Sequence, residues 1–483
     1  MGGDIAVRNA VHAPPSASFR FVVAGVVAAV IGSVWTLITA DTIPVVVGFG
    51  VGLAFVECAA LLARSRGFTA TVIPVLVVNA VMLSGLIWWP VVAPYAIVSA
   101  RLGVDMDALV NAALYGMAFT ASFTAGTLLV GMGGAKALNL SKFADIHIPT
   151  GALVAASYVV LALTFAGYGS ALLRGDYLGS TGPEAVVIAA NALAPVALIS
   201  VCFAVFRPGG VVRVLAALGI VLWTLILFGR ASRTLAALPV FLLLGWKLST
   251  KKPVRWWHIA LVAIATVFLL QLPLALRSNE NGVGLLNLSE AFISDPGAVM
   301  ARFDPAGVAG NLLFSAPLAG LVGSIPLAPE TLWISITPVG GETAGWTALS
   351  PYLKVNASTP YNTIGELAAH GWTALALVPL LIGAVFALAE RIASNLPGLL
   401  ASAGLLMVVA VAALYSVQIL QYNLRSSTRL VWYLLAGVAV VWLVSVLFRR
   451  QRATRREARF ALRTDASVSR FRRPSASHLT RAT

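Results

Sequence analysis

The sequence predicts an all-α polytopic membrane protein with about twelve transmembrane helices and one large extracytoplasmic loop. Two observations lead to this fold class. The chain of 483 residues is 59% hydrophobic and 11% charged, whereas soluble domains carry roughly 25% charged residues. Apolar runs of about 17 to 23 residues also recur along the chain, and each is long enough to cross a hydrocarbon core of roughly 30 Å as a helix.

Hydrophobic runs, and the Gly, Pro and charged residues between them, define the predicted spans. They lie at approximately 21–40, 43–63, 69–89, 108–130, 149–168, 185–206, 212–229, 234–248, 257–276, 372–389, 397–419 and 430–448. A further apolar run at 308–326 contains Asn311, Ser315 and Pro317, so we expect an interfacial or re-entrant helix there.

These spans divide the chain into five parts. We expect a cytoplasmic N-terminal segment at 1–20, nine spans within 21–276, an extracytoplasmic loop with short or re-entrant helices at 277–371, three spans within 372–448, and a basic cytoplasmic tail at 449–483. The tail has few large apolar residues, so we expect it to be disordered or to lie along anionic headgroups.

The distribution of basic residues predicts that both termini are cytoplasmic. The net charge is +15, and eleven of the 33 Lys and Arg residues lie in the tail after Phe448. With the N-terminus inside, this tail and most basic loops fall on the inner side, as the positive-inside rule requires. We therefore interpret the positive charge as topology and contact with membrane lipids, and we expect no nucleic-acid partner.

Arginines on the outer side of this topology are candidates for binding a diphosphate. Arg230 and Arg233 lie in the turn GRASR, Arg277 follows the ninth span at once, and NLRSSTRLVW carries Arg425 and Arg429 before the twelfth span. Basic residues normally favour cytoplasmic loops, so arginines on the outer side need a reason to be there. One such reason is binding of phosphate oxygens, which a guanidinium group does bidentately. The alternative is ordinary snorkelling or pairing with acidic residues of the loop.

Two residues at the exit of the loop are candidates for proton transfer. Glu366 and His370 are four positions apart, which places them on one face of a helix. A carboxylate near an apolar boundary can have a raised pKa and accept a proton from a sugar hydroxyl. The alternative is an acid that stabilises a helix start, beside a histidine at the membrane interface.

Glu57 lies inside the second predicted span. An acidic residue at such a position is a functional candidate. Arg64, two helical turns further on, is a structural partner that would satisfy it instead, and the sequence favours neither interpretation.

Several common catalytic patterns do not occur. The sequence contains no GxxxxGK[ST], HExxH, CxxC or GxSxG motif, and its five histidines are scattered. We therefore expect no ATP hydrolysis, no protein metal site and no cofactor. Cys58 and Cys202 fall within apolar runs and are expected to be buried thiols.

Four segments within residues 210–448 carry a resemblance to a known family. They are the GRASR turn before a basic loop (KLSTKKPVRW), a span ending in LALRSN, the loop exit TPYNTIGELAAHGWTALALVPLLIGAVF, and NLRSSTRLVWYLL. Together they resemble the Wzy-type oligosaccharide repeat-unit polymerases, within the O-antigen polymerase and ligase superfamily.

This resemblance implies a metal-independent, GT-C-like glycosyltransferase of the bacterial inner membrane. Its substrates would be polyprenyl diphosphate-linked oligosaccharides, its partners chain-length regulator and flippase proteins, and its reaction transfer of the growing glycan to a hydroxyl of the next lipid-linked unit. The arginines would stabilise the diphosphate leaving group, and Glu366 would accept the proton.

Three other functions remain open at this point. They are an O-antigen ligase-like glycan transferase, a secondary transporter or flippase of lipid-linked oligosaccharide, for which Glu57 is a suitable midplane residue, and a non-catalytic assembly factor.

Overall fold

The computed structural model describes residues 17–39, 41–65, 69–92, 104–130, 149–175, 180–250, 252–277, 282–301, 310, 313–355, 360–396, 399–440, 442–443 and 446. In these ranges every regular element is a helix, apart from an isolated antiparallel bridge between Gly175 and Val283. This agrees with the expected all-α class, since only helices or closed barrels satisfy the backbone inside a bilayer.

The long helices are α2 (Ala17–Thr39), α3 (Ile43–Ser65), α4 (Val72–Val92), α5 (Met106–Leu129), α6 (Thr150–Tyr168), α7 (Glu184–Ala204), α8 (Gly210–Gly229), α9 (Leu238–Ser249), α10 (Trp256–Arg277), α18 (Trp372–Ser394) and α19 (Leu399–Gln421). A last described helix covers 424–440, and we call it the terminal helix. Between α10 and α18 lie α11 (Leu285–Ser294), α12 (Pro296–Ala301), α14 (Ser315–Gly323), α15 (Leu332–Ile336), α16 (Trp346–Leu349) and α17 (Thr363–Ala369). Short 3₁₀ helices are η4 (Gly169–Leu172), η5 (Arg233–Ala237), η6 (Pro329–Thr331) and η7 (Ser350–Leu353).

Eight of the described helices are long and apolar enough to cross a membrane. A ninth is counted if the two halves of α7, bent by 41° relative to each other, form one span. Pro195 lies inside α7, where it removes a backbone hydrogen bond and bends the helix. The chain is therefore a multi-pass α-helical membrane protein.

The outer surface of the helices has the character expected next to lipid. On α2, Val26, Ile31 and Leu37 are all more than half exposed. The buried interior instead holds polar side chains, including Glu57 and Asn79. Lipid tails cannot hydrogen bond, so polar groups collect where other helices offer partners.

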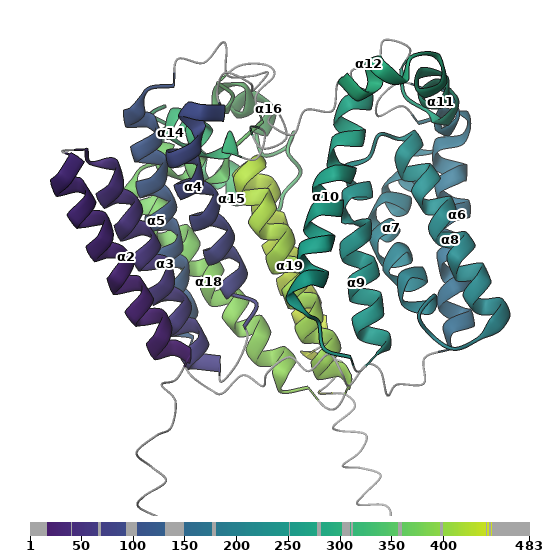
Figure 1. Ribbon diagram of the computed structural model, residues 1–483, viewed down its shortest axis with the longest axis horizontal. Helices are drawn as coiled ribbons and strands as arrows, with labels where there is room; N and C mark the ends of the chain where they lie inside the picture. Colours follow the sequence, from purple (N-terminus) through teal and green to yellow (C-terminus); the bar gives the residue numbers. More distant parts are fainter. Residues whose placement is uncertain are drawn as a thin grey trace, which may run out of the picture.

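The long helices run between two faces of the molecule (Figure 1). We call the face that carries α11, α12 and α14–α17 the loop face, and the other the opposite face. Because α14 has nine residues and is buried almost throughout, the apolar run predicted at 308–326 contributes a short helix packed against α4, α5 and α17.

The helices form two bundles with separate apolar cores (Figure 1). The first bundle contains α2–α5, α14–α19 and the terminal helix, and the second contains α6–α12. The bundles meet where Leu406 of α19 packs against Phe203 and Leu248 of the second bundle.

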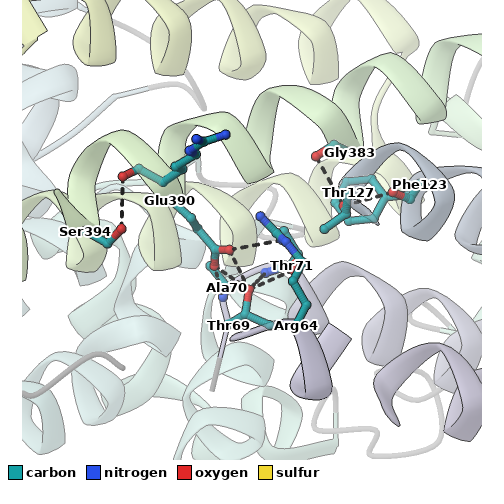
Figure 2. A network of polar contacts seen from close by, with 10 residues as sticks. Arg64, Thr69, Ala70, Thr71, Phe123, Thr127, Gly383, Glu390 and Ser394 are labelled. Carbon is teal, nitrogen blue, oxygen red and sulfur yellow. Dashed lines mark hydrogen bonds and ion pairs between the residues drawn. The ribbon is translucent and has the colours of Figure 1, made fainter. Parts of the chain in front are cut away.

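A polar contact joins α18 to the α3–α4 connection (Figure 2). The carboxylate of Glu390 accepts hydrogen bonds from the Thr69 hydroxyl at 2.6 Å and from the Ala70 backbone N–H, and lies 3.8 Å from a guanidinium nitrogen of Arg64. Of the two interpretations left open for Glu57, the one in which Arg64 satisfies it does not fit, because Arg64 lies beside Glu390. Arg64 ends α3 at the opposite face, where Glu390 is the acid within reach.

The crossing of α5 and α18 depends on two glycines. A side chain at Gly126 would collide with the carbonyl of Leu380, and one at Gly383 would collide with the carbonyl of Phe123. The backbones of the two helices therefore touch, as small residues permit in membrane helix pairs.

We expect Gly126→Ala and Gly383→Ala each to destabilise the first bundle by about 1–3 kcal/mol or more, because the added methyl group must push the helices apart. Thermal unfolding in detergent measures this. Gly151→Ala is the matched control, since an added Cβ there meets no heavy atom within 4 Å. Equal unfolding temperatures for all three variants would contradict the close crossing.

Candidate functional site

The segment between α10 and α18 covers both bundles at the loop face. Leu288 and Phe292 of α11 pack against Phe228 and Ala231 at the end of α8. In the first bundle, α14 packs against α5 and α4, and α17 packs against α14, α18 and α19. The folded loop is thus anchored on both bundles rather than extending freely from one.

Glu366 lies at the centre of the part of the loop face that covers the first bundle. Asn362 caps α17 by accepting a hydrogen bond from the Gly365 N–H at 2.9 Å. One carboxylate oxygen of Glu366 accepts a hydrogen bond from the Ser335 hydroxyl, and the other accepts from the Leu424 backbone N–H at 2.8 Å. Glu366 therefore links α17 to α15 and to the start of the terminal helix.

The environment of Glu366 changes its acidity. Its side chain is only 1% exposed, and desolvation raises its pKa from 4.5 to about 7, although the hydrogen bonds from Ser335 and Leu424 oppose the shift. A carboxylate with a pKa near 7 suits proton transfer at neutral pH. The same contacts also suit a residue that positions the terminal helix.

Further hydrogen bonds join the start of α17 to α14, α19 and the terminal helix. The amide of Asn362 donates to the backbone carbonyls of Ser315 and Leu420 at 3.0 and 2.9 Å. The hydroxyl of Thr363 lies 2.7 Å from that of Ser427. Buried networks of this kind hold their members in one arrangement.

His370 follows α17 and is mostly buried. Neither of its ring nitrogens makes a hydrogen bond of normal geometry. Burial lowers its pKa, and the backbone of Ala328 partly opposes this effect. The imidazole therefore makes no hydrogen bond with Glu366, whose oxygens bond to Ser335 and Leu424.

Arg425 and Arg429 belong to the first turns of the terminal helix, which begins at 424 rather than at the predicted 430. Arg425 is 2% exposed and donates hydrogen bonds to the backbone carbonyls of Ile334, at 2.6 Å, and Val339. Arg429 is exposed. The buried arginine thus fastens α15 and the residues after it, and the exposed one lies one helical turn further along.

Arg230 ends α8 in the second bundle. Its guanidinium donates hydrogen bonds to the Tyr168 hydroxyl at 2.6 Å and the Asn191 side-chain carbonyl at 3.1 Å. It also lies 3.8 Å above the Tyr168 ring, a favourable cation–π contact. Two other helices, α6 and α7, therefore fix its position.

The turn after Arg230 is strained. Ala231 has φ 45°, a left-handed conformation that costs a non-glycine residue about 1–2 kcal/mol. Glycine is the usual residue at such a helix end. Here the alanine is buried against Val283 and Leu288, so its methyl group contributes to anchoring the loop.

The structure brings the positions of the proposed arginines to one face but to two bundles, and the side chains of Arg233 and Arg277 lie outside the part of the chain that it describes. Arg230 and Arg233 lie at the end of α8 and the start of η5, and Arg277 ends α10, which packs against η5. All three belong to the second bundle. Arg425 and Arg429 belong to the first, with Glu366 and His370.

The residues that hold these groups were not singled out from the sequence. Tyr168, Asn191 and Ser335 are ordinary neighbours of apolar runs, and only their tertiary contacts mark them. For Asn191 the sequence contains one indication of a role, because an amide side chain lies there within a predicted span.

No protein-family model, curated protein or solved structure matches the chain. Among the residues that the structure describes, no three His, Cys, Asp or Glu side chains are grouped so as to hold a metal ion. A function for the loop face is therefore inferred from the positions and contacts of its residues.

The raised pKa of Glu366 predicts a pH-dependent stability. Because the folded pKa of about 7 exceeds the ordinary value of 4.5, the folded state holds its proton more tightly. This contribution, on the order of 3 kcal/mol, is fully present below about pH 4.5 and is lost as the pH rises through about 7.

Thermal unfolding of the wild type and Glu366→Gln between about pH 4 and about pH 8 measures this contribution. The unfolding temperature of the wild type should fall relative to that of the variant as the pH rises. A difference that stays constant over this range would show that Glu366 is ionised throughout.

Proposed function

We propose that the protein is a polymerase of polyprenyl diphosphate-linked oligosaccharide repeat units, with its reaction at the loop face. The observation that carries this proposal is the position of the arginines. The ends of α8 and α10 and the start of the terminal helix lie at the loop face. These positions carry Arg230, Arg277 and Arg429. That face is where a lipid-linked diphosphate would meet protein while its tail stayed among the helices.

In this proposal the diphosphate is bound mainly by Arg230, Arg233 and Arg277 in the second bundle. Arg230 is already oriented by Tyr168 and Asn191, which lowers the entropic cost of binding a phosphate group. In the first bundle Arg429 is the better ligand, because Arg425 already donates to two backbone carbonyls.

Glu366 is the proposed proton acceptor for the attacking sugar hydroxyl, with His370 beside it. Its pKa near 7 fits this role. Its two oxygens are enclosed by Ser335 and Leu424, so a substrate could reach it only after α15 or the start of the terminal helix moves. No metal or nucleotide is required, since the sugar–diphosphate bond supplies the leaving group.

A second candidate is a secondary transporter or flippase of lipid-linked oligosaccharide. It is favoured by the two bundles with separate cores, since alternating access commonly moves one bundle against another. An O-antigen ligase-like transfer uses the same chemistry as the polymerase and differs in its acceptor.

We further propose a location in the bacterial inner membrane with twelve spans and both termini in the cytoplasm. The described acidic residues outside the bundle interior, such as Glu184, Glu290 and Glu330, lie at the loop face, whereas Arg213, Lys252 and Arg255 lie at the opposite face. The positive-inside rule then places the opposite face in the cytoplasm.

Reporter fusions test this orientation. A fusion at Asp295 should report the extracytoplasmic side, and one after Arg456 should report the cytoplasm. The same side for both would overturn the proposed topology.

The purified protein, incubated with a polyprenyl diphosphate-linked repeat unit, should produce a ladder of longer glycans. Arg230→Ala should reduce the rate of this extension roughly 100-fold, because a preorganised donor to the leaving group is lost. Arg230→Lys should recover little, since a lysine lacks the bidentate geometry.

Arg213→Ala is the matched control, because Arg213 is exposed at the other end of the same helix. Normal extension by Arg230→Ala, at an unchanged protein level, would remove the diphosphate-binding role. Movement of intact lipid-linked substrate across vesicles without extension would favour the transporter.

Glu366→Gln should reduce turnover roughly 100-fold while binding of the lipid-linked substrate stays the same, because the amide cannot accept a proton. In the wild type the extension rate should rise with pH through about 7, as the carboxylate ionises. Ser335→Ala, which removes a hydrogen bond but keeps the carboxylate, should retain this pH dependence. A fully active Gln variant would leave Glu366 with a positioning role only.

A further inference from the structure

Glu57 lies in the interior of the first bundle, away from both faces and from the residues of the proposed reaction. It belongs to the membrane-spanning helix α3 and is 4% exposed. Its described polar neighbours are Asn79 of α4 and Thr120 of α5. Three helices therefore meet at one polar point in an otherwise apolar core.

The amide hydrogens of Asn79 have other acceptors besides Glu57. The two amide hydrogens of Asn79 have their shortest contacts with the Val75 carbonyl at 3.0 Å and the Thr120 hydroxyl oxygen at 3.1 Å. The contact from Asn79 to Glu57 is 3.4 Å. An amide has two hydrogens to donate and three acceptors lie within reach, so the contact with Glu57, the longest of the three, is the weakest.

Thr120 offers at most one hydrogen, and a backbone carbonyl competes for it. Its hydroxyl lies 3.2 Å from the Met117 carbonyl and 3.3 Å from Glu57. An ionised carboxylate accepts several hydrogen bonds when buried, and burial without them costs several kcal/mol. The site therefore offers a charged Glu57 only two long donor contacts, each shared with another acceptor.

No described contact supplies a positive charge either. Arg64, on the same helix, is paired with Glu390 at the opposite face (Figure 2). The other titratable or charged residues on the elements that pack around α3, α4 and α5 are Arg20, Cys58, Asp107, Tyr115, Glu366, Glu390, Arg391 and Tyr415. None of these has a described hydrogen bond or ion pair with Glu57.

We propose that Glu57 is a proton-binding site within the membrane-spanning region. The neutral carboxyl group donates its own hydrogen toward the Thr120 hydroxyl oxygen and needs no charged partner. Release of this proton would place a charge between three helices with only two long, shared donor contacts, so protonation and the packing of α3 against α4 and α5 are coupled. This inference does not depend on the proposed polymerase activity.

The site should react with a hydrophobic carbodiimide. A protonated carboxyl group adds across one C=N bond of the reagent: its oxygen bonds to carbon, its proton moves to nitrogen, and rearrangement leaves a stable N-acylurea with no other product. Glu390 is an internal control in the same bundle, because its carboxylate lies near Arg64 and accepts hydrogen bonds from Thr69 and Ala70.

The experiment treats the full-length protein in detergent at neutral pH with dicyclohexylcarbodiimide, and mass spectrometry locates the adduct. Labelling of Glu57 but not Glu390 is expected. Labelling of Glu390 but not Glu57 would overturn the proposal.

Infrared difference spectra provide a measurement that does not depend on access by the reagent. The wild type should show the carbonyl band of a protonated carboxyl group at neutral pH, and Glu57→Gln should lose it while keeping the wild-type unfolding temperature, because a glutamine amide can donate to Thr120 in the same way. Loss of a carboxylate band instead would show that Glu57 is ionised and would overturn the proposal.

Discussion

Within the membrane-spanning bundles, polar groups can find hydrogen-bond partners only in the protein itself. Lipid tails offer no hydrogen bonds, and an unpaired polar group in such surroundings costs several kcal/mol. The contacts of Glu390 with Ala70 and Thr69, and of Arg230 with Tyr168 and Asn191, follow from this constraint. Each of these contacts joins helices that are far apart in the sequence and thereby sets how the bundle is assembled.

The loop face depends on a similar set of contacts. Its helices are short, between four and ten residues, and would not be stable alone. α11 is held by apolar packing on the second bundle, whereas α15 and α17 are joined to the terminal helix through Glu366 and Arg425. A rigid platform of this kind is a common setting for binding sites in loops.

The candidate arginines differ in what they can do. Arg230 is oriented by the side chains of Tyr168 and Asn191 and by the aromatic ring of Tyr168. Arg425 is occupied by carbonyl groups of the loop, and Arg429, one helical turn further, is exposed. A diphosphate at this face would therefore meet arginines whose contacts within the protein differ. Substitutions at Arg425 would disturb the loop itself, because this residue donates hydrogen bonds to loop carbonyls.

The amino-acid sequence was enough to predict the helical membrane class, because long apolar runs in a chain with 11% charged residues have few other stable structures. It also identified Glu366 as an acid at a boundary and Glu57 as an acid within a span. The partners of both acids depend on how the helices pack and could not be predicted from it. Arg64 was one of two interpretations for Glu57 because it follows on the same helix. A long side chain near a helix end instead reaches the acid that a neighbouring helix presents, and α18 presents Glu390. Likewise Ser335 and Leu424 surround Glu366 from positions 31 and 58 residues away. Hydropathy describes how strongly each residue prefers an apolar medium to water. It carries no information about which helices pack together, and the packing of the helices determines the hydrogen-bond partners.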